Sequence, residues 1–137
     1  PLPAEAIINF LYEQSNLSSV LASENFSTLS LDYYSPSHID PKTGRSSREA
    51  IEAALNACHD FVDDFASGSG NLLLYGDIGV GKTFLSHCIA KELLEKSYSV
   101  IYFSASTENG KCIWKLGAKV VDDQEVAIID MAAYILL

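Results

Sequence analysis

The chain has 137 residues, a length that suits one small domain or part of a larger one. Its hydrophobic content of 48% excludes a disordered chain, and its net charge of −9, without any run of basic residues, argues against strong autonomous DNA binding. Three isolated cysteines with no CxxC pair are typical of reduced thiols, and no apolar run is long enough to cross a membrane. We therefore expect a cytoplasmic protein without a membrane span.

Two short helices are expected at the start of the chain. Apolar residues recur on one face from about Ala4 to Gln14, and Asn16 can cap a second helix over the residues that follow. A turn-rich segment with two prolines and a glycine then runs from residue 25 to residue 45. We interpret residues 1–45 as a helical and irregular lead-in segment and residues 46–137 as the core domain.

The clearest helix signal starts at Ser46. Ser46 and Glu49 have the spacing of a capping box, in which each residue satisfies a backbone donor of the other. Apolar residues then recur at three- and four-residue steps as far as residue 65, which predicts one continuous buried stripe. Gly68 and Gly70 are expected to end the helix and turn the chain.

Three apolar runs have the character of strands buried on both faces, as in a parallel sheet: NLLLY (71–75), SVIYF (99–103) and VAIID (126–130). Between the first two, a helix is expected from Lys82 to Lys96, because apolar residues stack there at four-residue steps. Strand, helix and strand in this order form a right-handed βαβ unit. The predicted fold class is therefore α/β, with a parallel sheet flanked by helices.

A complete GxxxxGK[ST] motif, the P-loop signature, lies between the first strand and this helix. Its glycines allow backbone conformations in which successive amides point into one concavity, at a helix N-terminus that favours an anion. Lys82 supplies a positive charge to the β- and γ-phosphates of a nucleoside triphosphate, and Thr83 supplies a hydroxyl to Mg²⁺. The expected nucleotide-binding residues are Gly76, Asp77, Ile78, Gly79, Val80, Gly81, Lys82, Thr83 and Phe84.

A P-loop ATPase also needs an acidic residue at the end of a buried strand to hold the Mg²⁺ shell. Asp130, at the end of the third apolar run, is the best candidate, and Asp122 or Asp123 is the rival. The expected metal-shell residues are therefore Thr83 and Asp130, and the expected catalytic residues are Lys82 and Asp130.

Beyond the motif, three segments resemble the bacterial helicase-loader ATPases of the DnaC/DnaI type, a branch of the AAA+ family, in their order and spacing. They are ENFSTLSLDYYS (24–35), DPKTGRSSRE (40–49) and NLLLYGDIGVGKTFLSHCIAKELLEKSYSVIYFSA (71–105). The resemblance covers roughly residues 20 to 105, and the related IstB transposition helpers, which share the ATPase core, are a close alternative. Tyr33 and Tyr34 lie in the segment that in relatives runs near the adenine pocket, although simple packing on the core explains them equally well.

The resemblance implies an AAA+-type P-loop fold with ATP and Mg²⁺ as cofactors. Residues 76–83 correspond to the Walker A loop and Asp130 to the Walker B acid. The implied function is ATP-driven assembly and delivery of a replicative DNA helicase to single-stranded DNA. The helicase, single-stranded DNA and further copies of the chain are the partners that it implies, although the acidic charge makes DNA binding by this chain alone weak.

Two departures from the family pattern leave ATP hydrolysis open. The family has a second acidic residue after the Walker B acid, which orients the attacking water, and Met131 stands there instead. Glu108, just after the second strand, lies on the side of the sheet where a substitute is needed. Only seven residues follow Asp130, whereas the family continues with a sensor strand, an arginine finger and a helical lid. We therefore expect a partial ATPase core over residues 46–137, truncated after the Walker B strand.

Three functions compete on this basis. The first is the ATP-dependent helicase loader. The second is a degenerate nucleotide-binding module that has a regulatory or protein-interaction role and does not hydrolyse ATP, which Met131 favours. The third is a small-molecule kinase, although no acceptor site or lid is recognisable in the sequence.

Overall fold

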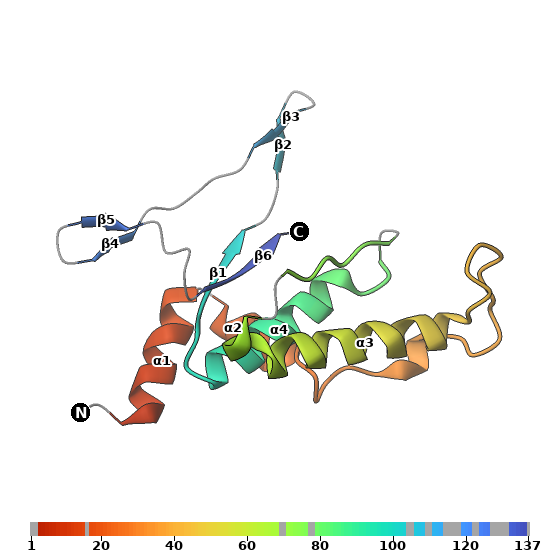
Figure 1. The fold of residues 1–137 in the computed structure, drawn as a ribbon, viewed down its shortest axis with the longest axis horizontal. Coiled ribbons are helices and arrows are strands. Elements are labelled where there is room, and N and C mark those ends of the chain that lie inside the picture. The colour runs from red at the N-terminus through yellow and green to blue at the C-terminus, as the bar shows by residue number, and fades with distance from the viewer. Residues whose placement is uncertain are drawn as a thin grey trace. The chain divides into compact units, whose positions relative to one another are not determined.

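The computed structural model describes residues 3–15, 17–68, 71–76, 79–103, 106–108, 111–113, 119–121, 124–126 and 132–136. The chain divides into two compact units, one made of residues 1–21 and 90–137 and the other of residues 22–89. Figure 1 labels the helices and strands along the chain. The expected boundary at residue 45 separates a lead-in segment from a functional core, and it stays a prediction.

Helices are the main regular structure of the described residues. The α-helices are α1 (Ala4–Ser15), α2 (Ser18–Ser23), α3 (Ser47–Asp63) and α4 (Lys82–Glu95), and two 3₁₀ turns are η1 (Leu31–Tyr33) and η2 (Phe65–Ser67). The helices expected from about Ala4 to Gln14, after Asn16 and from Lys82 to Lys96 are confirmed, while the expected cap Asn16 itself lies outside the described residues. The apolar face of α1 is more open than its pattern predicts, because Ile7 is 38% exposed and Phe10 is 52% exposed.

Helix α3 begins where the sequence predicts. The Ser46 hydroxyl oxygen accepts a hydrogen bond from the Glu49 backbone N–H at 3.1 Å, and the same hydroxyl donates to the Glu49 carboxylate at 3.3 Å. Along the predicted stripe, Ile51, Cys58 and Val62 are buried. The α-helix ends at Asp63 and η2 follows, after which Gly68 adopts the left-handed conformation that stops the chain, with φ of 80°. Gly70 lies outside the described residues.

Helix α4 contributes to the cores of both units. Its residues from Leu85 to Ala90 are all buried, so the middle of the helix is covered on every side. Among the residues whose burial is described, the buried apolar ones in the unit formed by residues 22–89 are Ile51, Cys58, Val62, Leu85, Cys88 and Ile89, and those in the other unit are Leu17, Leu21, Ala90, Leu93, Leu94 and Val100. None of the helices in the described part of the chain has both the length and the apolar character needed to cross a membrane.

The described strands form three separate pairs. Strand β1 (Ser99–Phe103), which the sequence predicts, pairs in parallel with β6 (Ala132–Leu136), in a register that places Ser99 opposite Ala132. The other two pairs are antiparallel: β2 (Ser106–Glu108) with β3 (Lys111–Ile113), and β4 (Lys119–Val121) with β5 (Gln124–Val126).

The predicted fold class, an α/β P-loop parallel sheet flanked by helices, is wrong. No sheet of more than two strands occurs among the described residues, and residues 71–76 belong to none of the pairs. Leu73 is 78% exposed and Tyr75 is 86% exposed, so this apolar run is not buried on both faces. In the run 126–130, Val126 ends the antiparallel strand β5, and residues 127–130 lie outside the described residues. An apolar run becomes a central strand only when other strands pair with both of its edges and other elements cover both of its faces.

Candidate functional site

The described part of the glycine motif turns the chain at residues 79–81, between residues 71–76, which belong to no helix or strand, and the start of α4. Gly79 has φ of 84° and Gly81 has φ of 107°, backbone conformations that side chains with a Cβ rarely adopt. Asp77 and Ile78 lie outside the described residues. The described glycines of the motif therefore form a local turn, although none of the described strands precedes it.

Lys82 joins the two ends of this turn. It is the first residue of α4, and its Nζ donates a hydrogen bond to the carbonyl oxygen of Gly76 at 2.8 Å. The ammonium group is therefore held beside the loop by a hydrogen bond that is exposed to solvent. Thr83 is exposed and Phe84 is half-buried, both in the first turn of the helix.

The N-terminus of α4 is electrostatically suited to an anion. The helix has 14 residues, and its first turn contains no acidic residue. The first helical hydrogen bond runs from the N–H of Leu85 to the carbonyl of Gly81 at 2.9 Å. The amides of the preceding turn have no acceptor within the helix, and the helix dipole adds partial positive charge there.

Tyr34 packs against the turn from the segment between η1 and α3. Its hydroxyl donates a hydrogen bond to the carbonyl oxygen of Val80 at 2.9 Å. An ideal Cβ on Gly81 would lie 2.4 Å from the same hydroxyl oxygen, so the contact requires a glycine. Burial raises the pKa of the Tyr34 phenol, which keeps it protonated and able to donate. The Nε of Arg48 donates to the carbonyl oxygen of Tyr34 at 3.2 Å.

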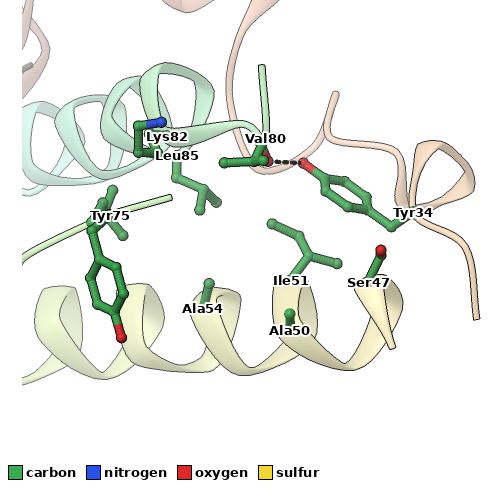
Figure 2. Close-up of a pocket in the computed structure, with 10 residues that line it drawn as sticks. Tyr34, Ser47, Ala50, Ile51, Ala54, Tyr75, Val80, Lys82 and Leu85 are labelled. Atoms are coloured by element: carbon green, nitrogen blue, oxygen red, sulfur yellow. Dashed lines mark hydrogen bonds between the residues drawn. The ribbon is translucent and has the colours of Figure 1, made fainter. Parts of the chain in front are cut away.

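A cavity of about 240 Å³ opens beside the loop. Figure 2 shows the small and branched side chains of α3 facing Val80 and Leu85, with Tyr34 at one end and Tyr75 at the other. The lining is mostly apolar, and Lys82 places a positive charge at its margin. The lining residues are Tyr34, Ser47, Ala50, Ile51, Ala54, Leu74, Tyr75, Val80, Lys82 and Leu85.

The segment that leads to Tyr34 is held by two contacts to the helices of its unit. Buried His87 on α4 bonds through its Nδ1 to the carboxylate of Glu24. Phe26 stacks on His59 of α3, with ring centroids 4.1 Å apart. Between them the side-chain oxygen of Asn25 accepts from the backbone N–H of Ser27, which forms a local turn. His87 and His59 therefore both pack against residues of this segment.

The structure brings together part of the predicted site. Gly76, Val80, Gly81 and Lys82 lie within one turn and are linked by the contacts above. Asp130, the predicted partner of Lys82 in catalysis and of Thr83 at the metal, lies outside the described residues. The rival acids at 122 and 123 and Met131 lie outside them as well. Among the residues that are described, no group of three or more His, Cys, Asp or Glu side chains is placed to hold a metal ion.

Sequence reasoning missed the contact between Tyr34 and the loop. The two partners are 46 residues apart, and neither belongs to a motif that specifies the other. The only available signal was the resemblance, which placed residues 33 and 34 near a nucleotide pocket without separating them. The structure separates them, since Tyr34 lines the cavity while Tyr33 is 90% exposed.

Comparisons with models of known protein families, with characterised proteins and with solved structures find no match to this chain.

Proposed function

We propose that the chain binds the phosphates of a nucleoside triphosphate, with ATP the expected nucleotide and Mg²⁺ its ion, at the turn formed by residues 76–83. The observation that carries this proposal is the Lys82 ammonium held against the loop at the N-terminus of α4. A lysine, a glycine turn and a helix N-terminus are the local elements that bind phosphates.

The local elements for phosphate binding are present although the described strands do not form the expected sheet. Phosphate recognition by such a loop depends on amide direction, helix dipole and a nearby cation, all of which act over a few ångströms. When phosphate oxygens approach, the Lys82 ammonium exchanges a neutral carbonyl acceptor for a charged one, and charge-assisted hydrogen bonds are the stronger kind. The mostly apolar cavity between α3 and the loop offers a space for the base.

The test is a calorimetric titration of the full chain with Mg-ATP and with inorganic tripolyphosphate. Lys82→Ala should weaken the binding of both ligands by about tenfold or more, because it removes the cation beside the loop together with its hydrogen bond to the Gly76 carbonyl. Lys96→Ala is the matched control, since it removes the same charge from an exposed residue just beyond the other end of the same helix. Equal binding by Lys82→Ala and the unmodified chain would refute the proposal.

On the larger scale, we propose a cytoplasmic helicase-loader role, with a replicative helicase as partner and self-association driven by ATP. The sequence resemblance over residues 20 to 105 supports it, and IstB-like transposition helpers share the same supporting residues. Steady-state ATP hydrolysis that is lost in Lys82→Ala, together with co-purification of a helicase, would support the loader role. A helicase absent from such a preparation would count against it.

One observation favours a second candidate, a nucleotide-binding module without turnover. Met131 follows Asp130, and a thioether cannot accept a proton from an attacking water. In that case ATP binds in a calorimetric titration but no phosphate is released over time. Turnover that depends on Lys82 would eliminate this candidate.

A further inference from the structure

The hydrogen bond from Tyr34 to Val80 fixes one peptide unit inside the glycine turn. The acceptor is the carbonyl oxygen of Val80, 2.9 Å from the phenol oxygen. A trans peptide is planar, with its C=O and N–H pointing in opposite directions. The N–H of Gly81 belongs to the same peptide unit as the Val80 carbonyl. It therefore points away from Tyr34.

Gly81 is the residue that makes this contact sterically allowed. A Cβ at this position would lie 2.4 Å from the phenol oxygen and 3.8 Å from the ring carbon that carries it. Its φ of 107° is also unfavourable for any residue with a side chain. By contrast, a Cβ at Gly79 would meet no atom within 4 Å. The tyrosine and the glycine are therefore matched to each other.

The backbone around Tyr34 is hydrogen-bonded to α3, and these bonds hold the phenol next to the loop. The guanidinium of Arg48 donates to the Tyr34 carbonyl at 3.2 Å, and the Arg48 backbone N–H donates to the carbonyl of Ser35 at 3.1 Å. Two successive residues of the segment are thus bonded to one residue of α3. A rigid helix sets the position of the ring, and the ring sets the direction of a loop peptide.

From these contacts we infer that Tyr34 is a positioning residue of the phosphate loop, which turns the Gly81 N–H toward a bound polyphosphate by holding the Val80 carbonyl. This inference rests on the proposed function and adds the device that preorganises the site. Without the hydroxyl, the peptide unit between residues 80 and 81 is free to rotate. Ordering this peptide unit on binding then lowers the net affinity for the polyphosphate.

The test compares Tyr34→Phe with Tyr33→Phe in the full chain. Tyr34→Phe keeps the ring and removes only the hydroxyl, while Tyr33→Phe removes the same group from a neighbour that is 90% exposed. Inorganic tripolyphosphate is the probe, since it has no base that could stack on the ring. Loss of one hydrogen bond predicts affinity about three- to tenfold weaker in Tyr34→Phe and unchanged in Tyr33→Phe.

A spectroscopic readout separates positioning from a general loss of structure. In ¹⁵N-labelled protein, the amide resonance of Gly81 should shift in Tyr34→Phe before any ligand is added, and its response to tripolyphosphate should shrink. Arg48→Lys, which keeps the charge but loses the planar donor, should move the same resonance in the same direction by a smaller amount. A cooperative thermal unfolding transition in each variant would show that it is folded.

The outcomes separate this inference from the function on which it rests. If the unmodified chain binds tripolyphosphate and Tyr34→Phe binds it equally well with an unmoved Gly81 resonance, the positioning role is wrong and the proposed function stands. Tighter binding by Tyr34→Phe also overturns the inference, because the phenol would then block the loop. If the unmodified chain binds neither tripolyphosphate nor Mg-ATP, the proposed function fails and takes the inference with it.

Discussion

The Nζ atom of Lys82 donates a hydrogen bond to the carbonyl oxygen of Gly76, 2.8 Å away, and so links the segment 71–76 to the start of α4. The bond joins residues six positions apart across the turn. A lysine that is purely structural would matter mainly for stability, whereas a lysine that binds phosphate would matter mainly for affinity. These two roles differ in what a substitution changes.

Lys82→Met keeps the length of the side chain and removes its charge. We expect the free energy of unfolding to fall by no more than about 1 kcal/mol, since the group is only half-buried and a typical hydrogen bond contributes that much. Affinity for tripolyphosphate should fall by about tenfold or more. Urea denaturation and calorimetry measure the two effects. A large loss of stability without a change in affinity would assign the lysine a structural role.

Gly81→Ala should destabilise the protein by about 1–3 kcal/mol, because a Cβ meets the Tyr34 hydroxyl and φ is positive. Gly44→Ala is the control, since φ is 70° there but no atom lies within 4 Å of the added Cβ. Combining Gly81→Ala with Tyr34→Phe removes the closest atom and should restore part of the loss. Purely additive unfolding free energies in this double-mutant cycle would show that the clash is unimportant.

The thiol of Cys58 should be inert in the folded protein. Its side chain is fully buried in α3, and burial raises its pKa from 9.0 to about 11. The raised pKa contributes stability that is fully present below pH 9 and is lost as the pH rises through about 11. Mass spectrometry after iodoacetamide treatment should find Cys58 unmodified near neutral pH and modified in urea. Rapid alkylation of the native protein would contradict the burial of this face of α3.

Glu24→Ala should destabilise the unit formed by residues 22–89. The Glu24 carboxylate bonds to Nδ1 of the buried His87 ring, and removing an acceptor from a buried donor costs about 1–3 kcal/mol. Glu52→Ala removes the same charge from an exposed position on α3, where substitutions usually change stability by less than about 0.5 kcal/mol. Urea denaturation of both variants measures the difference, and equal midpoints would show that this pair does not stabilise the fold.

Local sequence signals predicted much of the helical structure correctly. Ser46 caps α3 because a hydroxyl three residues before a backbone N–H satisfies it within a single turn, whatever surrounds the helix. The glycine turn and the start of α4 at Lys82 are likewise set by backbone preferences over a few residues. The strand at 99–103 is also confirmed, and it has a partner in β6.

The wrong prediction for residues 71–75 shows that local signals do not determine whether an apolar run is buried in a sheet. The run NLLLY has the composition of a buried strand, yet Leu73 and Tyr75 are largely exposed and the segment joins none of the described strand pairs. Composition expresses a preference for burial, whereas burial itself depends on which distant segments supply the neighbouring strands and the covering layers.

The sequence by itself determined the capped helix after Ser46, the glycine turn and the lysine that begins α4, because each depends on interactions within a few residues. Only the tertiary structure decided that the apolar run at 71–75 stays outside the described strand pairs and that Tyr34 holds the Val80 carbonyl across 46 residues of chain. Pairing between distant segments is governed by packing of the whole chain, which no short pattern encodes.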